Sequence, residues 1–477
     1  MDRIFLDLAL LTIVTLVFFF FAFFFLSKRN KINLPAGSAG WPIIGEMWEY
    51  LKAGRRGAPH SFFLKRMASY SPAVFRTKLI GQDMAVFCGP AGNKFLFTNE
   101  PKYVGLWLPK HLQKVVIFAI DSSKESVEKE AMELRSNLLP EFLRPEALKE
   151  YIPLMDAIAK DHLEEHWAPY KEVKVLLLSK AYSYTFGCNL LISLTDPKQI
   201  ARMHGPFKEM VTGLSSLPIN FPGTPFNRAV KASRIVGADM MAVVKQRRRE
   251  IKENPETANR TDILGKLLDG SEDDGMVSKR IIGFLLGSYH TLSTAITFTI
   301  SHIAEYPHVY ERVFQEQMEI ARSKAAGEAL NWQDIQKMKY SWCVVCESMR
   351  LMPPSKGSFR QAITDFTYEG VTIPKGWKTH WTVHTTHRNP EYFPEPDKFD
   401  PSRFEGKGPA PYTFVPFGGG PRMCPGREYA RLEILSFIHN VVTKFKLSKV
   451  DPNEKVIYRN NPFPANGMLI RLEPLGK

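Results

Sequence analysis

A glycine-rich loop near the C-terminal end presents one cysteine among residues with little side-chain bulk. It reads Phe417-Gly-Gly-Gly-Pro-Arg-Met-Cys424-Pro-Gly426. The glycines leave room for a large flat cofactor and can adopt backbone angles that are barred to other residues. A helix with apolar periodicity is predicted from Arg427 to Val442, and the N–H groups at its start would stabilise a negative sulfur. The pattern favours Cys424 as a thiolate ligand of a cofactor, with Arg422 placed to bind an acidic group on it.

Two other functions of such a loop do not fit the residues. A phosphate-binding loop needs a lysine followed by a serine or threonine after its glycines, and neither follows here. A structural zinc site needs about four closely spaced ligands, and no second cysteine or histidine pair lies near Cys424.

The rest of the chain predicts a mainly helical protein with small β-sheets. Its 477 residues are 44% apolar and 12% aromatic, so most of the chain is expected to fold around a large core. Strand-like runs occur at residues 73–88 and 367–384. Helical patterns are predicted at residues 128–139, 146–166, 229–254, 279–305, 308–325 and 332–352.

The N-terminal segment predicts a membrane anchor. Residues 4–26 are almost wholly apolar, which suffices for the roughly 20 residues that span a bilayer. The cluster Ser-Lys-Arg-Asn-Lys follows at once, so the body of the chain should face the cytosol. A cleaved signal peptide is the alternative. We divide the chain into an anchor (1–30), a proline-rich hinge (31–45) and a catalytic domain (46–477).

The net charge indicates which kinds of molecule the protein could bind, and the cysteines indicate whether disulfides are expected. Lysine and arginine number 63 against 49 acidic residues, a formal net charge of +14 that would attract an anionic leaflet or an acidic protein. No nucleic-acid recognition motif accompanies the basic groups, so nucleic acid is not expected as a partner. Five sparse cysteines do not resemble a disulfide framework, and Cys343 and Cys346 are expected to pack in the core.

The cysteine loop resembles the haem-binding signature of cytochromes P450, and other motifs agree in order and spacing. Glu347 and Arg350 in Cys-Glu-Ser-Met-Arg resemble the family's buried Glu-x-x-Arg pair, and Arg403 in Phe-Asp-Pro-Ser-Arg-Phe resembles its third member. The resemblance covers essentially the whole chain, and the anchor and hinge match the microsomal branch. It implies the cytochrome P450 fold, haem b as the cofactor, Cys424 as the iron ligand and Phe417 beside the haem. The Glu347–Arg350–Arg403 cluster would be structural.

The helix predicted from Lys279 to Tyr306 should then cross over the haem. Gly287 and Thr291 are four residues apart and share a face, where the missing side chain leaves room and the threonine hydroxyl can bond to the preceding turn. The resemblance implies an oxygen groove there, although packing alone would also explain the pattern. The family pattern places an acid before the threonine, whereas this chain has His290, whose ordinary pKa of about 6.5 suits proton transfer. Serine at 288 replaces a glycine.

The resemblance also implies arginines that bind the haem propionates. Arg422 and Arg360 match such positions. Arg135 is in register with a Trp-x-x-x-Arg pattern, but Ala131 occupies the tryptophan position. We therefore rank Arg422 and Arg360 above Arg135.

The implied reaction is insertion of one oxygen atom of O2 into a C–H bond. No dinucleotide fingerprint is present, so electrons must come from another protein, which the resemblance identifies as NADPH–cytochrome P450 reductase. The implied location is the endoplasmic reticulum membrane, with a single span and the catalytic domain in the cytosol.

The closest likeness is to plant oxidases of triterpenes such as β-amyrin and dammarane skeletons. A diterpenoid or steroid-hormone oxidase is the alternative within the enzyme class, and a haem-bound terpenoid carrier is the alternative outside it. Lys356 is the odd polar member of the expected pocket and either meets a substrate hydroxyl or points to solvent. The expected pocket residues are Leu106, Trp107, Phe284, Ser288, Lys356, Phe359 and Phe463.

Overall fold

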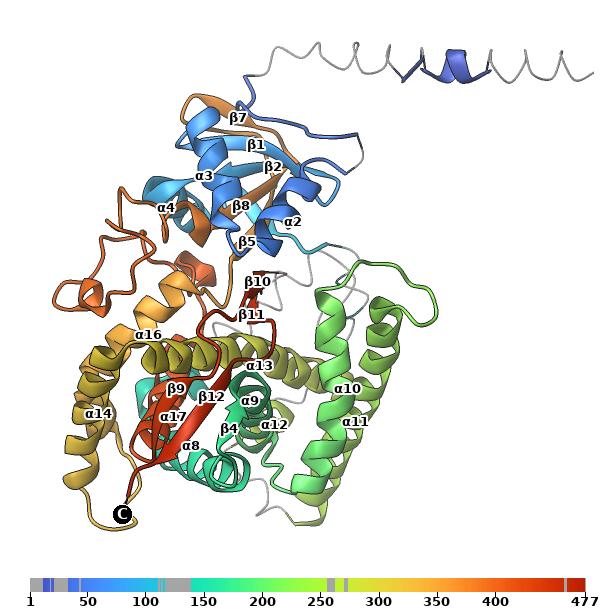
Figure 1. Ribbon diagram of the computed structural model, residues 1–477. Helices are drawn as coiled ribbons and strands as arrows, with labels where there is room; N and C mark the ends of the chain where they lie inside the picture. The colour runs from blue at the N-terminus through green and yellow to red at the C-terminus, as the bar shows by residue number, and fades with distance from the viewer. Residues whose placement is uncertain are drawn as a thin grey trace, which may run out of the picture.

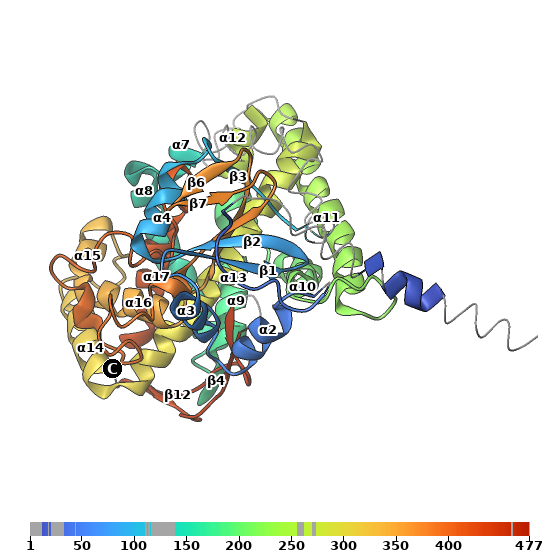
Figure 2. The same cartoon turned by 90° about the horizontal axis from the view of Figure 1, so that it is seen from above.

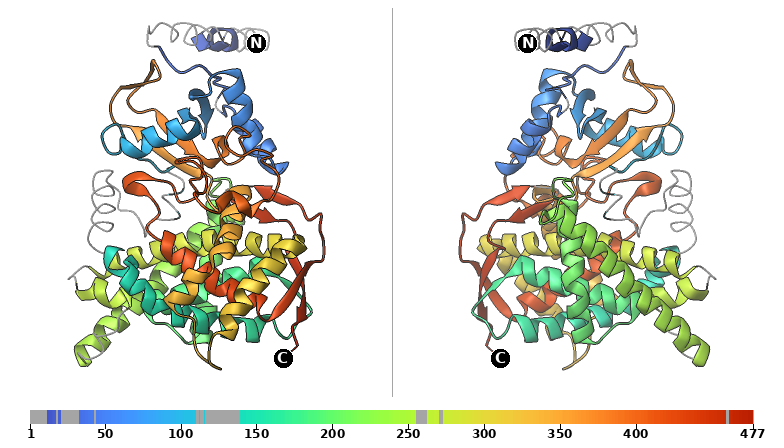
Figure 3. Two further views of the ribbon diagram at one scale, coloured as in Figure 1. Left: turned by 90° about the vertical axis from the view of Figure 1, so that its left-hand side faces the viewer. Right: turned by 90° about the vertical axis from the view of Figure 1, so that its right-hand side faces the viewer.

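The computed structural model describes residues 12–17, 19–20, 33–42, 44–109, 112, 115, 139–254, 262–269, 273–458 and 461–476. A sheet-containing part, drawn mainly in blue and orange, lies above a larger helical body (Figure 1). Both side views show the same division (Figure 3). The prediction of a mainly α protein with small sheets is confirmed.

The helical body is built by long helices, several of which begin with proline at their first turn, where its missing N–H has no helical partner to lose. They are α7 (Leu139–Leu143), α8 (Pro145–His166), α9 (Val175–Ile192), α10 (Pro197–Leu214), α11 (Pro225–Glu253), α12 (Ile263–Asp269), α13 (Asp274–Glu305), α14 (Pro307–Arg322), α15 (Trp332–Lys337), α16 (Lys339–Leu351) and α17 (Arg427–Val442). Three shorter helices, α2 (Met47–Arg55), α3 (His60–Ser69) and α4 (Gly89–Thr98), accompany the upper sheet.

The main sheet has the strand order β1-β2-β8-β5-β3. Its strands are β1 (Val74–Leu79), β2 (Gln82–Phe87), β8 (Lys378–Thr382), β5 (Gly357–Ala362) and β3 (Val104–Leu106). All pairs are antiparallel except β2 with β8, so residues more than 280 positions apart lie side by side, as in the register of Phe87 with Trp381. This pairing fixes the second half of the chain against the first.

The smaller sheets are β10 (Val456–Tyr458) with β11 (Pro462–Pro464), β4 (Glu172–Lys174) with β12 (Leu469–Pro474) and β9 (Phe445–Lys449), and β6 (Phe366–Tyr368) with β7 (Val371–Ile373). The first two belong to the helical body, and the third, β6 with β7, belongs to the upper part and packs against the main sheet. Short 3-10 turns form η3 (Val383–Thr385), η4 (Pro401–Phe404) and η5 (Gly420–Arg422). The β10–β11 hairpin lies above α13 in Figure 1.

Helix α13 runs through the middle of the helical body, as the view from above also shows (Figure 2). It contacts α9, α11, α16 and α17, and together these helices bury the largest apolar clusters. In the described part of the chain, α9 and α13 are also long and apolar enough to cross a membrane, but 67% and 61% of their apolar windows are buried inside the protein. Both helices are therefore core elements.

Several sequence predictions agree closely with the structure. Helix α17 has the predicted bounds, the first predicted strand run contains β1 and β2, and the second contains β7, β8 and all of β6 except its first residue. The single helix predicted at 332–352 is instead divided into α15 and α16, because Met338 leaves the helical region with φ −75° and ψ 53°. The helix predicted at 128–139 lies, apart from its last residue, outside the described residues.

Most of the predicted anchor also lies outside the described residues. Residues 12–17 and 19–20 are helical, and their apolar side chains are exposed. All five cysteines are described and none forms a disulfide, and Cys343 and Cys346 are buried as predicted.

Candidate active site

The cysteine loop is held against α4 and β8 at its glycines. Gly418 and Gly420 have φ of +70° and +67°, a region that favours glycine. A Cβ on Gly420 would lie 2.1 Å from the Phe97 backbone oxygen, so no other residue fits there. The Cys424 N–H donates to the Phe417 oxygen at 2.8 Å and closes the loop. The loop shape is therefore rigidly determined.

Cys424 lies just before the start of α17, whose N-terminal flanking residue is Gly426. The cysteine side chain is partly exposed, in contrast to the other four cysteines, which are buried. A Cβ on Gly426 would lie 4.0 Å from Sγ, so the glycine keeps bulk away from the sulfur. The N-terminal end of a helix favours the thiolate form. The thiolate can thus serve as a ligand without obstruction from its own loop.

One face of α13 is open in the middle of the helix. Gly287 is exposed, and no atom lies within 4 Å of the position a Cβ would take. The hydroxyl of Thr291 donates to the Gly287 backbone oxygen at 2.7 Å. The two residues therefore share a face, as predicted from their spacing, and this face offers open space beside a movable hydroxyl.

Two arginines predicted to bind an acidic group of the cofactor meet at one buried carboxylate. Arg360 donates to Glu100, and the Arg422 Nε lies 3.6 Å from the other oxygen of Glu100. The side chains of all three residues are less than 10% exposed. Arg360 is further bonded to the Ser358 hydroxyl at 2.7 Å. Two cations facing one anion leave this cluster with an excess positive charge that suits a further acidic group.

Sequence reasoning missed Glu100. It lies between α4 and β3, more than 250 residues from both arginines, and nothing in its local pattern marks it. The pairing of β3 with β5, in which Leu106 lies opposite Arg360, brings this part of the chain to Arg360, and the packing of the cysteine loop on α4 brings it to Arg422.

Glu347 and Arg350 form a completely buried ion pair on α16. Two parallel bonds of 2.6 and 2.7 Å join the guanidinium to the carboxylate. Arg350 also donates to the backbone oxygens of His387, Pro396 and Lys398. The Arg403 Nε lies 3.6 Å from Glu347. The three residues therefore bind α16 to the segment that leads into the cysteine loop.

His290 projects to a different part of the protein from Thr291. It lines a pocket with Lys180 of α9 and Lys208 of α10, and Thr291 is absent from the lining of that pocket. Burial, and after it the charge of Lys180, lowers the pKa of His290 to about 4. Its Nδ1 is buried and has no hydrogen-bond partner among the described residues. The imidazole is therefore neutral at neutral pH, contrary to the expectation based on its ordinary pKa.

The residues predicted to line a substrate pocket come from β3, β5, β11 and α13 and from the loop residues next to β3 and β5. Trp107 and Phe359 meet edge to face with ring centroids 5.8 Å apart, and Phe359 stacks on His380. Phe463 of β11 lines the pocket that contains His290. Leu106 is partly buried in β3. These residues are partly exposed apolar groups, as a pocket lining requires.

Three further predicted pocket residues have local partners. Phe284 is partly buried on α13, and its backbone oxygen accepts from the Ser288 hydroxyl at 3.2 Å. The Ser288 hydroxyl lies 3.9 Å from the position a Cβ would take on Gly187, so it faces α9. The Lys356 ammonium donates to the Tyr50 hydroxyl at 2.7 Å and reaches α2. Arg135 and Ala131 lie outside the described residues.

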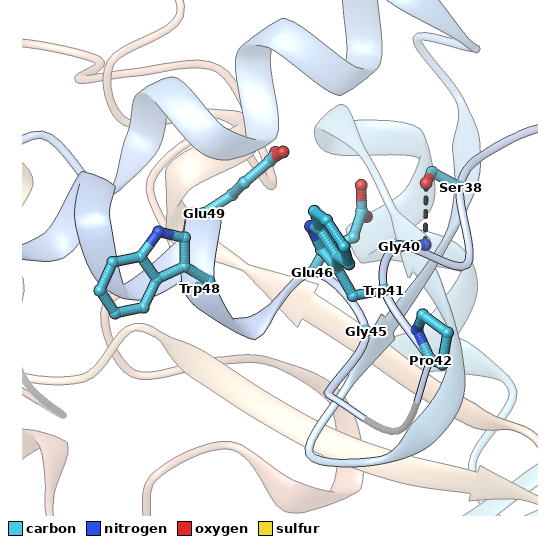
Figure 4. Close-up of a pocket in the computed structure, with 8 residues that line it drawn as sticks. All are labelled: Ser38, Gly40, Trp41, Pro42, Gly45, Glu46, Trp48 and Glu49. Atoms are coloured by element: carbon cyan, nitrogen blue, oxygen red, sulfur yellow. Dashed lines mark hydrogen bonds between the residues drawn. The ribbon is translucent and has the colours of Figure 1, made fainter.

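A separate hollow lies in the hinge region, lined by residues that include Trp41, Trp48, Glu46 and Glu49 (Figure 4). Glu46 is bonded there to Arg66 and Thr77. None of its lining residues belongs to the predicted site, so it is not part of the reaction centre.

The arrangement fits a haem cofactor. An uncrowded cysteine at a helix start can ligate iron, two arginines with one carboxylate between them can bind an acidic substituent, and the open face of α13 leaves space beside a hydroxyl. In the described part of the chain no cluster of three or more His, Cys, Asp or Glu residues offers a site for a directly bound metal ion.

Comparison with known proteins gives consistent results. Residues 35–470 match the family model described as Cytochrome P450. The chain is 50% identical over 455 residues to β-amyrin 6-beta-monooxygenase of Solanum lycopersicum, with 94% of each chain covered. It is 49% identical over 470 residues to β-amyrin 28-monooxygenase of Kalopanax septemlobus, covering 96% of this chain and 97% of the other. The solved structure of retinoic acid-bound cyanobacterial CYP120A1 superposes with a TM-score of 0.81 at 28% identity, covering 93% of this chain and all of the other.

Proposed function

This chain belongs to the cytochrome P450 family and is a haem-thiolate monooxygenase, and from this we propose that its substrate is a plant triterpene of the β-amyrin or dammarane type. The observation that carries the proposal is the identity of 48 to 50% with several β-amyrin monooxygenases over at least 93% of this chain. The partly exposed aromatic groups near the site suit a rigid hydrocarbon skeleton.

The proposed overall reaction balances as R–H + O2 + 2 e⁻ + 2 H⁺ → R–OH + H2O. One C–H bond of the substrate breaks, one C–O bond forms, and the second oxygen atom leaves as water. The cofactor, which we propose is haem b, supplies the activation of O2 when it is bound through a thiolate. A redox partner must supply the two electrons, and we propose NADPH–cytochrome P450 reductase.

The residues of this chain have separate proposed roles. Cys424 ligates the iron and Phe417 and Gly287 border the cofactor. Arg360 and Arg422 hold its acidic substituents, and Arg135 is a weaker candidate for the same task. The Thr291 hydroxyl can release its bond to Gly287 and pass a proton into the open space beside it. Glu347, Arg350 and Arg403 hold the loop that carries the cysteine.

His290 has a narrower proposed role than its sequence suggested. The imidazole is neutral at neutral pH. It can therefore relay a proton by accepting one at one ring nitrogen while it donates one from the other, but it does not hold an extra proton as a stable cation.

We propose that the protein is a single-pass protein of the endoplasmic reticulum membrane, with the catalytic domain in the cytosol. The anchor would comprise residues 1–30, the hinge 31–45 and the catalytic domain 46–477. Exposed apolar side chains outside the anchor support contact with a bilayer: Trp41, Ile44 and Trp48 near the hinge, and Leu217, Ile219 and Phe221 after α10. The positive net charge of +14 suits both an anionic leaflet and an acidic reductase surface.

The function is tested by reconstituting the full-length protein with reductase, NADPH and β-amyrin. The proposal expects NADPH-dependent formation of a product heavier by one oxygen, detected by mass spectrometry. Spectral binding of β-amyrin without any product would support a carrier. Product from a diterpene or steroid, with none from β-amyrin or a dammarane triterpene, would show that the enzyme is a diterpenoid or steroid oxidase instead.

A further inference from the structure

The pocket that His290 lines, on a different side of α13 from Thr291, has a cationic lining. It lies where α9, α10 and α13 meet the β11 hairpin, elements that Figure 1 shows next to one another. Its volume of about 140 Å³ leaves room for more than one water-sized group. The lining includes Lys180, Lys208, Thr212, His290, Asn461 and Phe463.

No carboxylate compensates the two lysines within the described residues. No acid lines the pocket, and neither Lys180 nor Lys208 takes part in an ion pair there. Glu209, which follows Lys208 in sequence, is instead paired with Arg228 at 3.1 Å. Burial, and after it the charge of Lys208, lowers the pKa of Lys180. Lys180 is partly buried and Lys208 is exposed, and two ammonium groups in one pocket without a carboxylate provide a site for an anion.

The other polar groups of the pocket favour the same ligand. The Tyr289 hydroxyl is hydrogen-bonded to His204 at 2.9 Å, so it does not bind either lysine in the place of a ligand. Burial, and after it the charge of nearby lysines, lowers the pKa of both His204 and His290 to about 4, so the two rings are neutral at neutral pH and carry no charge of their own beside the lysines. The Asn461 side chain supplies an uncharged donor in the lining, whereas the Thr212 hydroxyl already donates to the Lys208 backbone oxygen at 2.8 Å.

The location of the pocket connects the anion to the substrate. Its lining includes His290, the residue before Thr291, and Phe463 of β11. His290 and Thr291 are consecutive residues of α13, so a ligand whose acidic end lies in this pocket has its other end free to extend along α13 toward the face that carries Gly287 and Thr291.

We propose that Lys180 and Lys208 bind the carboxylate of an acidic triterpenoid, so that the chain recognises a triterpene acid better than its uncharged derivative. This inference rests on the proposed function for the skeleton of the ligand but not for its charged group. A triterpene acid implies an earlier oxidation, so an enzyme that converts a methyl group of the skeleton to a carboxyl group must supply the substrate.

The test compares a pentacyclic triterpene acid with its methyl ester, which keeps the skeleton and removes the charge. Full-length haem-loaded protein is titrated with each, and binding is followed by the change in haem absorbance. Wild type is expected to bind the acid about tenfold more tightly than the ester, the gain from one charge-assisted contact. Lys208→Gln and Lys180→Met should each remove most of this difference. Lys198→Gln, an exposed lysine on the same helix as Lys208, is the matched control and should preserve it.

Several outcomes overturn the proposal. One is equal affinity of wild type for the acid and the ester, and another is an equal loss of selectivity in Lys198→Gln and Lys208→Gln. If added acetate alters binding of the ester while the acid has no advantage, the pocket takes only small free anions and the proposal also fails.

Failure of the triterpene assignment gives a distinguishable result. If neither triterpene changes the spectrum, the same titration is made with a diterpene acid and a steroid acid and their methyl esters. Selectivity for an acid that depends on Lys208 would then support the carboxylate site while overturning the triterpene skeleton. Absence of selectivity with every pair would overturn the carboxylate site as well.

Discussion

The Thr291 hydroxyl is bonded to the Gly287 backbone oxygen one turn earlier in α13, at 2.7 Å, on a side of the helix where a Cβ on Gly287 would touch nothing. A hydroxyl that bonds back to its own helix beside open space can exchange that bond for one to a ligand. This relationship supports the proposal that Thr291 delivers a proton.

The change Thr291→Ala should therefore uncouple the enzyme, so that NADPH is consumed without a matching amount of product. Product formed per NADPH is expected to fall on the order of tenfold or more, because proton delivery in the transition state is lost. Thr291→Ser keeps the hydroxyl and should restore most of the yield. Thr294→Ala removes an equivalent bond, to the His290 oxygen, on a buried face and serves as the control. Equal coupling in Thr291→Ala and wild type would assign Thr291 to packing.

The second prediction concerns pH and His290. Because burial and then Lys180 lower its pKa to about 4, the side chain gains a proton only near that pH and stays neutral above about pH 5.5. The contribution of His290 to coupling, measured as the difference between wild type and His290→Ala, should be constant between about pH 5.5 and 8. A difference that titrates near the ordinary histidine value would show that the imidazole is charged in the working enzyme. No difference at any pH would remove His290 from the proton route.

The third prediction concerns the buried pair on α16. Glu347→Gln leaves the completely buried Arg350 without its charge partner, and the loss of one member of such a pair is expected to lower the free energy of unfolding by about 3–5 kcal/mol. Glu209→Gln breaks the exposed pair with Arg228 and should change the free energy of unfolding by less than about 1 kcal/mol. Denaturant unfolding of both variants gives the comparison. Similar values for the two variants would contradict a structural role for the buried cluster.

The fourth prediction concerns Glu100, the carboxylate between Arg360 and Arg422. If haem propionates also lie against these arginines, they supply a second source of negative charge when the cofactor is bound. Glu100→Gln should therefore destabilise the protein without haem by about 1–3 kcal/mol and the haem-loaded protein by less. Thermal unfolding of both forms measures this difference. An equal loss in both forms would place the propionates elsewhere.

Local patterns predicted the elements that act through short stretches of sequence. The cysteine loop, the bounds of α17 and the shared face of Gly287 and Thr291 all depend on neighbouring residues, and the spacing of residues was enough to predict them. The division at Met338 was missed because the apolar periodicity continues through it.

Features built by distant segments could not be predicted in this way. Glu100 meets Arg360 through the pairing of β3 with β5, and Lys180 and Lys208 line one pocket because α9 and α10 pack together beside α13. The lowered pKa of His290 has the same origin, since burial and a lysine more than 100 residues away cause it. Tertiary packing determines where these charged groups meet and how their pKa values shift, and the local sequence pattern does not indicate either.

The central claim is that Cys424 ligates haem iron as a thiolate. The most direct measurement is the absorption spectrum of the purified, reduced full-length protein under carbon monoxide. The account predicts a strongly red-shifted Soret band for wild type and its loss in Cys424→Ser, while Cys343→Ser keeps the band because Cys343 is buried in α16 away from the loop. A haem-loaded wild-type protein that lacks the shifted band, or a Cys424→Ser variant that retains it, would contradict the account.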